Sequence, residues 1–373
     1  MGLSNIEVKK ANRNSILQHM LKVEAVSKNS IAEALQLSIP TVTQGLSDLE
    51  EIGLVKKEGI LESSGGRKAM SYSCIKDAKI ALGIDITVNH INIVMINMAK
   101  QVMYTKGIRI RIHDEDASYQ ELKTVIYQAI EESGVPFEKI LGMGISLPAI
   151  VDETESGIHA MNEEMEISRQ LYDIVKDWFP FPVILGNDAN SGGKAEMRLG
   201  GADKNMVYFF ISQTVGGAII INGQVFYGKN QRGGELGHMT LIPGGRPCYC
   251  GRTGCMNAYC STKILSNLTN GNLDEFFKGL ERKEEEYVAV WEEYLDHLAL
   301  AVHNLNMVFD GEIVIGGYLG QYIGDYLEQL EERVRKIDTY LTDRPFLKAS
   351  TLKYDASAIG IASVFVDKYT EEI

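Results

Sequence analysis

The residues best suited to chemistry are one histidine and three cysteines that lie close together in the chain. His238 precedes the segment Cys248-Tyr-Cys250-Gly-Arg-Thr-Gly-Cys255 by ten positions. One imidazole and three thiolates make the tetrahedral donor set that is typical of a closed structural zinc site. The spacing therefore predicts a structural Zn²⁺ ion bound by His238, Cys248, Cys250 and Cys255. The alternative is a group of buried cysteines beside an unrelated histidine.

Length and cysteine count restrict the class of protein. A chain of 373 residues with 45% hydrophobic content is expected to form two or three soluble domains. The sequence has five cysteines, and two of them, Cys74 and Cys260, lie outside the cluster. An odd count with this clustering predicts a reducing cytoplasm rather than a disulfide framework. Residues 1–10 lack the apolar segment of a signal peptide, and no run of about 18 apolar residues occurs. We therefore expect a cytoplasmic protein that does not bind a membrane.

Charge is divided unevenly along the chain. The net charge is −13, yet residues 1–77 hold 10 basic and 9 acidic side chains, against 27 and 41 in the remainder. The basic side chains of the first segment gather within residues 9–13 and 56–68. A local patch, not total charge, decides attraction to phosphate. The charge distribution therefore permits DNA binding by the first segment.

Residues 1–77 have the pattern of three helices followed by a hairpin. Apolar residues recur at helical spacing over residues 12–21, and Ser27 and Ser38 can each cap a further helix. The third helix is expected to end at Gly53, before a hairpin over residues 54–74. Its expected apolar face consists of Val42, Leu46, Leu49 and Ile52.

This order of elements predicts a DNA-binding module. Two helices joined by a short turn, with small polar residues early in the second, are typical of a helix-turn-helix. We predict a winged helix-turn-helix that binds operator DNA through Ser38, Thr41 and Gln44. Arg67 and Lys68, at the tip of the wing, are expected to add affinity for the DNA backbone or the minor groove. The alternative is a small helical dimerisation module with a solvated charged face.

From residue 80 onward, strands and helices alternate. This pattern is typical of α/β lobes that gather ligands at the ends of their strands. The expected strands cover residues 81–86, 91–97, 101–110, 140–146, 183–186, 206–211, 218–221 and 312–315. The expected helices cover residues 119–133, 189–198, 284–308 and 356–363.

The cysteine segment and this α/β pattern resemble the ROK family, which groups sugar kinases with sugar-responsive transcriptional repressors. The resemblance implies an α/β fold in which an N-terminal winged helix-turn-helix precedes a two-lobed, actin-like sugar-kinase fold. It implies a DNA-binding domain at residues 1–77, a first lobe at 78–188 plus 356–373, and a second lobe with the zinc site at 189–355. It also implies assembly as a homodimer or homotetramer.

The resemblance further implies a sugar-binding cleft. Asp188 stands where the kinases have their catalytic base, although a carboxylate there can equally accept hydrogen bonds from two sugar hydroxyls, or simply cap the next helix. Asn187 precedes it, and Glu235 matches a sugar ligand of the family. His238 is expected to bind zinc with one ring nitrogen and to face the sugar with the other. Asn257 replaces the usual glutamate, which favours a different hydroxyl or an acetamido group.

Both phosphate-binding loops of the family kinases are altered in this chain. Their first loop reads Asp-x-Gly-Gly-Thr, whereas residues 85–89 read Asp-Ile-Thr-Val-Asn. Val88 therefore stands where a bare backbone is needed to approach phosphate. In the second loop, residues 212–218, three of five family glycines are replaced. ATP-dependent phosphorylation is not expected, and Asp188 is interpreted as a vestigial base.

The sequence therefore predicts a transcriptional regulator, most simply a repressor, that leaves its operator when a monosaccharide or a derivative binds in a former kinase cleft. An ATP-dependent sugar kinase that carries a DNA-binding module is the main alternative. A third hypothesis treats the zinc–thiolate cluster as a redox or metal sensor.

Overall fold

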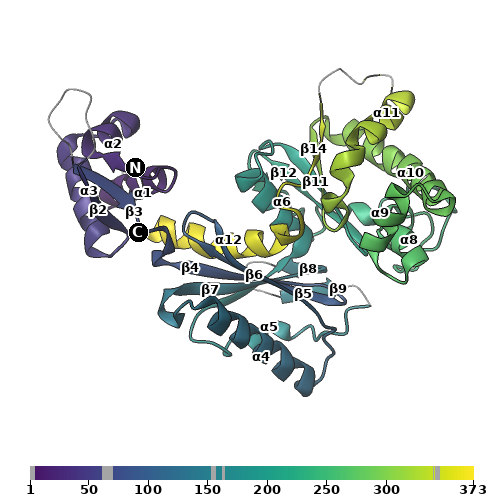
Figure 1. The fold of residues 1–373 in the computed structure, drawn as a ribbon, viewed down its shortest axis with the longest axis horizontal. Helices are drawn as coiled ribbons and strands as arrows, with labels where there is room; N and C mark the ends of the chain where they lie inside the picture. The colour runs from purple at the N-terminus through teal and green to yellow at the C-terminus, as the bar shows by residue number, and fades with distance from the viewer. Residues whose placement is uncertain (1–4, 61–69, 153–156, 162–163, 339, 341–344) are drawn as a thin grey trace.

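The computed structural model describes residues 5–60, 70–152, 157–161, 164–338, 340 and 345–373. They form a small N-terminal domain and two α/β lobes (Figure 1). The N-terminal domain and the second lobe lie on opposite sides of the first lobe, which confirms the predicted fold class. Among the helices that the structure describes, none has both the length and the apolar character needed to cross a membrane.

The N-terminal domain has three helices and a small antiparallel sheet. Its elements are α1 (Asn5–Met20), β1 (Val26–Ser27), α2 (Lys28–Leu35), α3 (Ile39–Glu51), β2 (Val55–Ile60) and β3 (Met70–Cys74), with strand order β1-β3-β2. The predicted caps are confirmed, because Ser27 Oγ accepts from the backbone N–H of Ser30 and Ser38 Oγ from that of Thr41. β2 and β3 form the predicted hairpin, whose tip lies outside the described residues.

Two local expectations in this domain were wrong. α1 begins seven residues before the expected position. The sequence pattern missed this start because the first turns carry no buried apolar stripe: Ile6 is 78% exposed. Ile52 does not join the buried face of α3 and is half-exposed, whereas Val42, Leu46 and Leu49 are buried. Ile52 is the C-cap, so its backbone has already left the helical conformation that sets the face.

The first lobe is built on a five-stranded sheet with the order β10-β7-β4-β5-β6. Its strands are β4 (Ile80–Ile86), β5 (His90–Asn97), β6 (Val102–Arg109), β7 (Ile140–Leu147) and β10 (Val183–Asn187). α4 (Asp116–Ser133) and α5 (Leu171–Val175) lie below the sheet in Figure 1, and α12 (Ala356–Glu372) lies above it. All seven residues of β4 are buried, as expected for a central strand covered on both faces.

The second lobe repeats this arrangement with the strand order β13-β12-β11-β14-β15. Its strands are β11 (Met206–Ile211), β12 (Val215–Ile221), β13 (Gln224–Val225), β14 (Glu312–Gly316) and β15 (Leu347–Ala349). Its helices are α7 (Asn257–Cys260), α8 (Lys263–Ser266), α9 (Leu273–Glu281), α10 (Glu285–Phe309) and α11 (Leu327–Ile337). A further hairpin of β8 (Ala149–Asp152) and β9 (Gly157–Met161), which the sequence pattern did not indicate, leads out of the first lobe.

Two helices pack closely where the lobes meet. α6 (Asp188–Leu199) contacts α12 along its length and also packs on β12 of the second lobe. At the crossing, a Cβ atom added to Gly360 would lie 1.8 Å from the carbonyl oxygen of Ser191. Only glycine therefore allows the backbones of α6 and α12 to approach this closely.

Replacing Gly360 by alanine is expected to force α6 and α12 apart and to lower the free energy of unfolding by about 1–3 kcal/mol. Urea unfolding followed by circular dichroism measures the change. Gly157→Ala is the control, because a Cβ there meets no atom of the described residues within 4 Å. Equal stability of the two variants would contradict the close packing of these helices.

Candidate functional site

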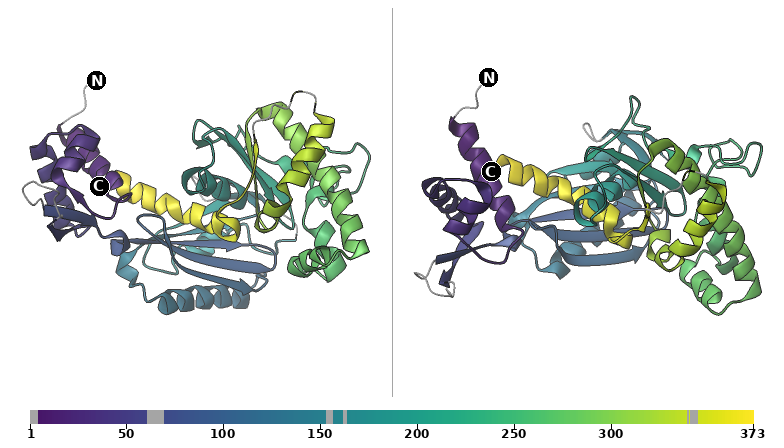
Figure 2. Two further views of the ribbon diagram at one scale, coloured as in Figure 1. Left: turned by 45° about the horizontal axis from the view of Figure 1, so that its top comes forward. Right: turned by 90° about the horizontal axis from the view of Figure 1, so that it is seen from above.

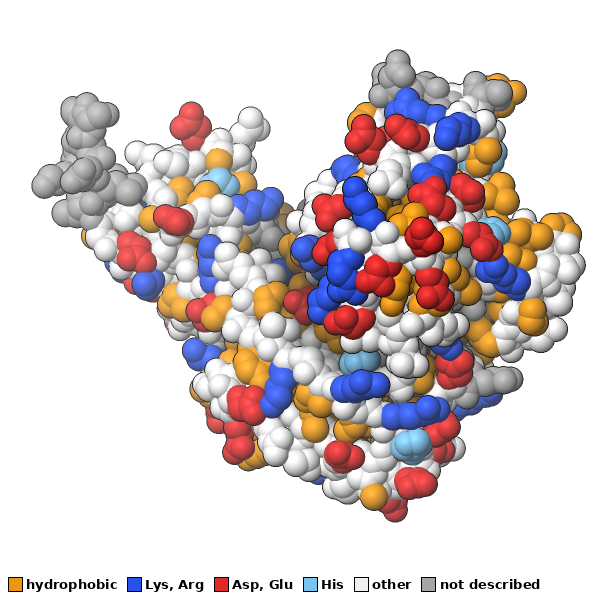
Figure 3. Space-filling view, turned by 45° about the vertical axis from the view of Figure 1, so that its right-hand side comes forward, with side chains coloured by type: hydrophobic (Ala, Val, Ile, Leu, Met, Phe, Trp, Pro, Cys, Tyr) orange, Lys and Arg blue, Asp and Glu red, His pale blue; other side chains and the backbone are white. Residues whose placement is uncertain are grey.

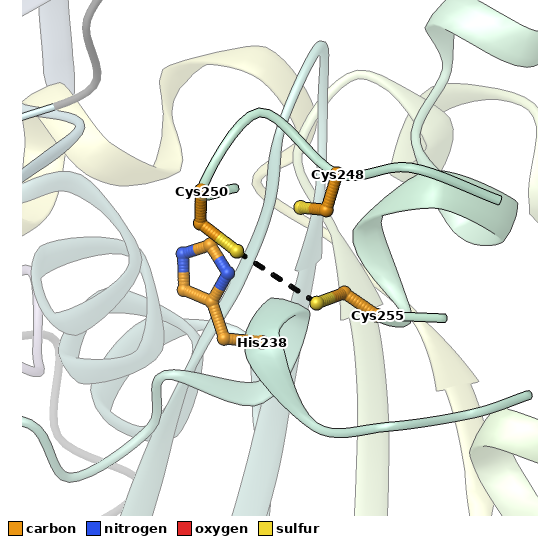
Figure 4. Close-up of side chains that lie close together, drawn as sticks. All are labelled: His238, Cys248, Cys250 and Cys255. Carbon is orange, nitrogen blue, oxygen red and sulfur yellow. Dashed lines mark hydrogen bonds between the residues drawn. The ribbon is translucent and has the colours of Figure 1, made fainter. Parts of the chain in front are cut away.

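The four predicted metal ligands lie together in one loop region of the second lobe (Figure 4). Each residue offers one ligand atom, and these atoms all lie within 4.8 Å of one another. His238 ends a short 3-10 helix (Leu236–His238), and the three cysteines follow on the next loop. Gly254 closes that loop at φ +80°, where its N–H donates to Arg246 and its carbonyl accepts from Leu241.

The donor atoms of this cluster fit a metal ion. Nδ1 of His238 is buried and has no hydrogen-bond partner among the described residues, an arrangement that is costly unless a ligand is bound. Figure 4 shows one ring nitrogen facing the gap between the sulfurs of Cys250 and Cys255, which are 3.8 Å apart. Burial raises the pKa of the Cys255 thiol to about 12, so a thiolate there needs a nearby cation. This His/Cys3 cluster could therefore hold a metal ion.

A cavity of about 130 Å³ lies between the lobes, next to the cluster. The β8–β9 hairpin forms an apolar wall, and polar side chains of α6 and the second lobe face it. The described lining consists of Pro148, Ala149, Ile150, Ala160, Met161, Asn187, Asp188, Phe210, Thr214, Val215, Gly216, Glu235, His238 and Tyr249. The structure thus brings together four of the five residues that were predicted to bind sugar.

Carboxyl groups dominate the polar side of the cavity. Burial raises the pKa of Asp188 well above its usual value, and the nearby Asp85 and Glu235 raise it further, although the backbone N–H of Ala189 opposes this. Burial also raises the pKa of Glu235. No lysine or arginine belongs to the lining among the residues that the structure describes. The cavity therefore suits a neutral ligand whose hydroxyls hydrogen-bond to carboxyl groups, and disfavours an anion.

The amide side chains at the site have structural partners. Asn187 is the N-cap of α6: its Oδ1 accepts from the N–H of Asn190 at 2.8 Å, and its Nδ2 donates to the carbonyl of Ala149 at 3.0 Å. Asn187 is thus the N-cap, and Asp188, the first residue of α6, also accepts from a first-turn amide, the N–H of Ala189, at 2.8 Å. Asn257 does not line the cavity, and its Oδ1 accepts from the N–H of Val215 at 2.8 Å. Asn257 therefore holds a wall residue in place.

Tyr249, which the sequence reasoning missed, joins the metal cluster to the cavity. Its hydroxyl lies 3.2 Å from Nε2 of His238, and Oε2 of Glu235 lies 4.0 Å from the same nitrogen. Nε2 of His238 thus faces the cavity residues Tyr249 and Glu235. Nδ1, the other ring nitrogen, has no partner among the described residues. The position of Tyr249 between Cys248 and Cys250 was the available signal.

The predicted DNA contacts lie on and before α3. Ser38 and Gln44 are exposed and Thr41 is half-buried. The hydroxyls of Ser38 and Thr41 lie 2.8 Å apart, and Gln44 donates to Asp48 at 2.7 Å. Arg67 and Lys68 lie outside the described residues.

At the two altered loops, the backbone N–H groups of Thr87, His90 and Ser212 are hydrogen-bonded within the protein. The N–H of Thr87 donates to the carbonyl of His90 at 2.9 Å, and the N–H of His90 donates to Oγ1 of Thr87. Val88, between them, is buried in the core of the first lobe. In the second loop, the N–H of Ser212 donates to the carbonyl of Thr214 at 2.9 Å. These amides are not free to bind phosphate.

Comparison with known proteins places this geometry in a family. The model of the ROK family matches residues 81–368. The putative xylose repressor of Caldicellulosiruptor sp. (strain Rt8B.4) is 26% identical over 96% of both chains. The DNA-binding transcriptional dual regulator NagC of Escherichia coli (strain K12) is 25% identical over 72% of this chain and 68% of its own.

Solved structures share the fold. A ROK family transcriptional regulator, described as a homolog of the E. coli MLC protein, superposes with a TM-score of 0.73 and 18% identity, covering 98% of this chain and 97% of its own. A ROK hexokinase from Thermus thermophilus superposes with a TM-score of 0.60 and 24% identity, covering 79% of this chain and 100% of its own. The first therefore matches the N-terminal domain as well as the lobes.

Asp85 is expected to make stability depend on pH. Burial raises its pKa to about 6, against 3.8 ordinarily, although Ser146 donates to it. Between pH 4 and 6 the unfolded chain loses this proton while the folded chain keeps it, so stability falls as pH rises. Asp85→Asn should therefore stabilise the protein by about 1–3 kcal/mol at pH 7 and have little effect at pH 4.

Urea unfolding at pH 4, 5, 6 and 7 measures this difference. Asp177→Asn, at an exposed position, controls for the loss of one negative charge. A stabilisation by Asp85→Asn that does not change between pH 4 and 7 would contradict the assignment.

Proposed function

Since the chain belongs to the ROK family, we propose that it is a transcriptional repressor that leaves operator DNA when a monosaccharide binds between its lobes. The observation that carries the proposal is the inter-lobe cavity with Asp188 and Glu235 on its polar side, in a chain that also carries a winged helix-turn-helix. Relatives named as xylose and N-acetylglucosamine repressors support it.

The proposed effector is a neutral monosaccharide. The cavity of about 130 Å³ is much smaller than the pockets that hold drug-sized ligands. Its carboxyl groups can accept hydrogen bonds from vicinal hydroxyls, while Ile150 and Met161 offer apolar contact to ring carbons. A sugar phosphate would bring a dianion toward Asp188 and Glu235. The names of the relatives place D-xylose and N-acetylglucosamine first among the sugars to test.

We propose that the chain does not phosphorylate this sugar. Asp188 is buried at the position of the catalytic base, which alone favours the kinase alternative. Against it, the backbone amides of Thr87, His90 and Ser212 are bonded within the protein. A nucleotide triphosphate would have to break these hydrogen bonds to reach the amides. The side chain of Val88 would also keep the phosphate groups away from the backbone of the first loop.

We propose that the His/Cys3 cluster holds a structural Zn²⁺ ion through His238, Cys248, Cys250 and Cys255. A bound cation would fix Nδ1 of His238 and thereby the ring nitrogen that faces the cavity. The metal ion would then affect sugar binding only by orienting His238. Because four protein ligands complete a tetrahedral site, no coordination position is left open for catalysis.

We propose that a homodimer or homotetramer binds a two-fold symmetric operator, with the start of α3 in the major groove. In this proposal Ser38, Thr41 and Gln44 make base or phosphate contacts. Arg67 and Lys68 make backbone or minor-groove contacts.

Sugar-dependent release from DNA tests the function. A duplex selected by the wild-type protein from a random DNA pool serves as the operator probe in fluorescence anisotropy. We expect one neutral sugar of a panel of pentoses, hexoses and N-acetylhexosamines to weaken DNA binding by about 5–150-fold, the usual range of allosteric coupling. Glu235→Gln should need a higher sugar concentration because an amide offers one acceptor oxygen where the carboxyl group offers two. Sugar-dependent ADP release that Asp188→Asn abolishes would contradict the proposal and favour the kinase.

Metal content tests the zinc site. The purified protein is expected to contain about one Zn²⁺ per chain, the stoichiometry of a Cys3His site, by plasma mass spectrometry. Cys255→Ser should lose the metal and unfold at a lower temperature, because metal binding and folding are coupled. Cys260→Ser is the matched control, since Cys260 is also buried but outside the cluster. Equal metal content in both variants would contradict the assignment.

A further inference from the structure

The C-terminal helix α12 spans the distance from the sugar cavity to the DNA-binding domain. It starts where the lobes meet and ends beside the N-terminal domain, where the C-terminus lies (Figure 2). A helix of 17 residues is about 25 Å long. The DNA-binding domain and the second lobe stand apart across the first lobe (Figure 3), so a signal between them must pass through the first lobe or α12.

At its cavity end, α12 is bonded to the residue that lines the cavity. Oγ of Ser357 donates to the backbone carbonyl of Asp188 at 3.0 Å, and both residues are buried. One turn later, Gly360 allows α12 to touch the backbone of α6 at Ser191. A shift of Asp188 at the start of α6 is therefore passed to α12 by direct contact.

In its second half, α12 carries a carboxylate held by two cations. Asp367 accepts from Lys100, on the turn between β5 and β6, at 2.6 Å, and is also paired with Arg198 near the end of α6. Lys100 and Asp367 are only 16% and 26% exposed, so water screens this pair less than a surface pair. α6 and α12 are thus tied at both ends and are expected to move together.

At its far end, α12 belongs to the core of the DNA-binding domain. Ile373, the last residue, is 8% exposed and packs in the hydrophobic cluster that includes Ile16 and Leu17 of α1. Nδ2 of Asn14, also in α1, donates to the backbone carbonyl of Thr370. The end of α12 therefore contacts α1 directly and helps to orient the DNA-binding domain, together with Met98 of the first lobe, which packs in the same cluster.

We infer that α12 transmits the sugar signal: binding at Asp188 moves the start of α12, and its buried end reorients α1 and the helix-turn-helix. Ser357 and Asn14 act as positioning residues at its two ends. A helix that is held by contacts at both ends can transmit a displacement from one end to the other, because its backbone hydrogen bonds resist bending. This inference rests on the proposed repressor function, whose sugar and DNA sites it connects.

Paired variants at the two ends of α12 test the inference in the full-length protein. Ser357→Ala removes the bond to Asp188, and its control Ser363→Ala removes a hydroxyl that bonds only the backbone of its own helix at Ile359. Asn14→Ala removes the bond to Thr370, and its control Ser15→Ala removes a hydroxyl that bonds Ala11 within α1.

For each variant, anisotropy with the selected duplex gives the DNA Kd with and without the panel sugar that releases the wild-type protein, and calorimetry gives the sugar Kd. The coupling factor is the ratio of the two DNA Kd values. We expect Ser357→Ala and Asn14→Ala each to lower the coupling factor by about threefold or more, measured against a usual factor of about 5–150. Asn14→Ala should leave the sugar Kd unchanged, which mere loss of folding would not do. Both controls should keep the wild-type factor.

Wild-type coupling factors in both Ser357→Ala and Asn14→Ala would overturn the inference while leaving the repressor function standing. Equal losses in the test and control variants would overturn it as well, because general destabilisation would then explain them. A wild-type protein that binds the sugar but never leaves DNA would overturn the repressor function, and the inference with it.

Discussion

The close packing of α6 on α12 is the contact on which the rest of the molecule depends. Gly360 lets the two backbones meet, and the same pair of helices covers the first sheet, begins at the cavity and supports the second lobe through β12. Because interiors are close-packed, two helices in backbone contact cannot slide independently. The cavity and the N-terminal domain are therefore both in contact with this pair of helices.

Burial of carboxyl groups gives the cavity its chemistry. Asp188 and Glu235 have raised pKa values because they are desolvated, and Asp85 adds to the effect at Asp188. Such groups gain from any ligand that restores the hydrogen bonds of water. A polyhydroxylated sugar does so without adding charge. A metal ion bound by the His/Cys3 cluster would occupy Nδ1 of His238 and leave Nε2, which lies beside Tyr249, to face the cavity.

Sequence reasoning located elements where the physical signal is local. A few neighbouring residues were enough to predict the caps at Ser27 and Ser38 and the buried strand β4. The same holds for the spacing of the cysteines. The roles of the site residues remain predictions. The pattern missed the β8–β9 hairpin, because alternation over four residues is too short to stand out from a loop. It also could not place Asn257, whose partner lies 42 residues away in the chain.

In the proposed function the cleft keeps its sugar site, while the two altered loops no longer bind phosphate. A phosphate cradle needs backbone amides that point outward without partners, and such amides destabilise the protein until a ligand arrives. Here the N–H groups of Thr87 and Ser212 have internal acceptors, and Val88 adds its side chain to the core. A regulator that must remain folded and bound to DNA in the absence of its effector gains from such closure, whereas an enzyme that must readmit nucleotide at every turnover does not.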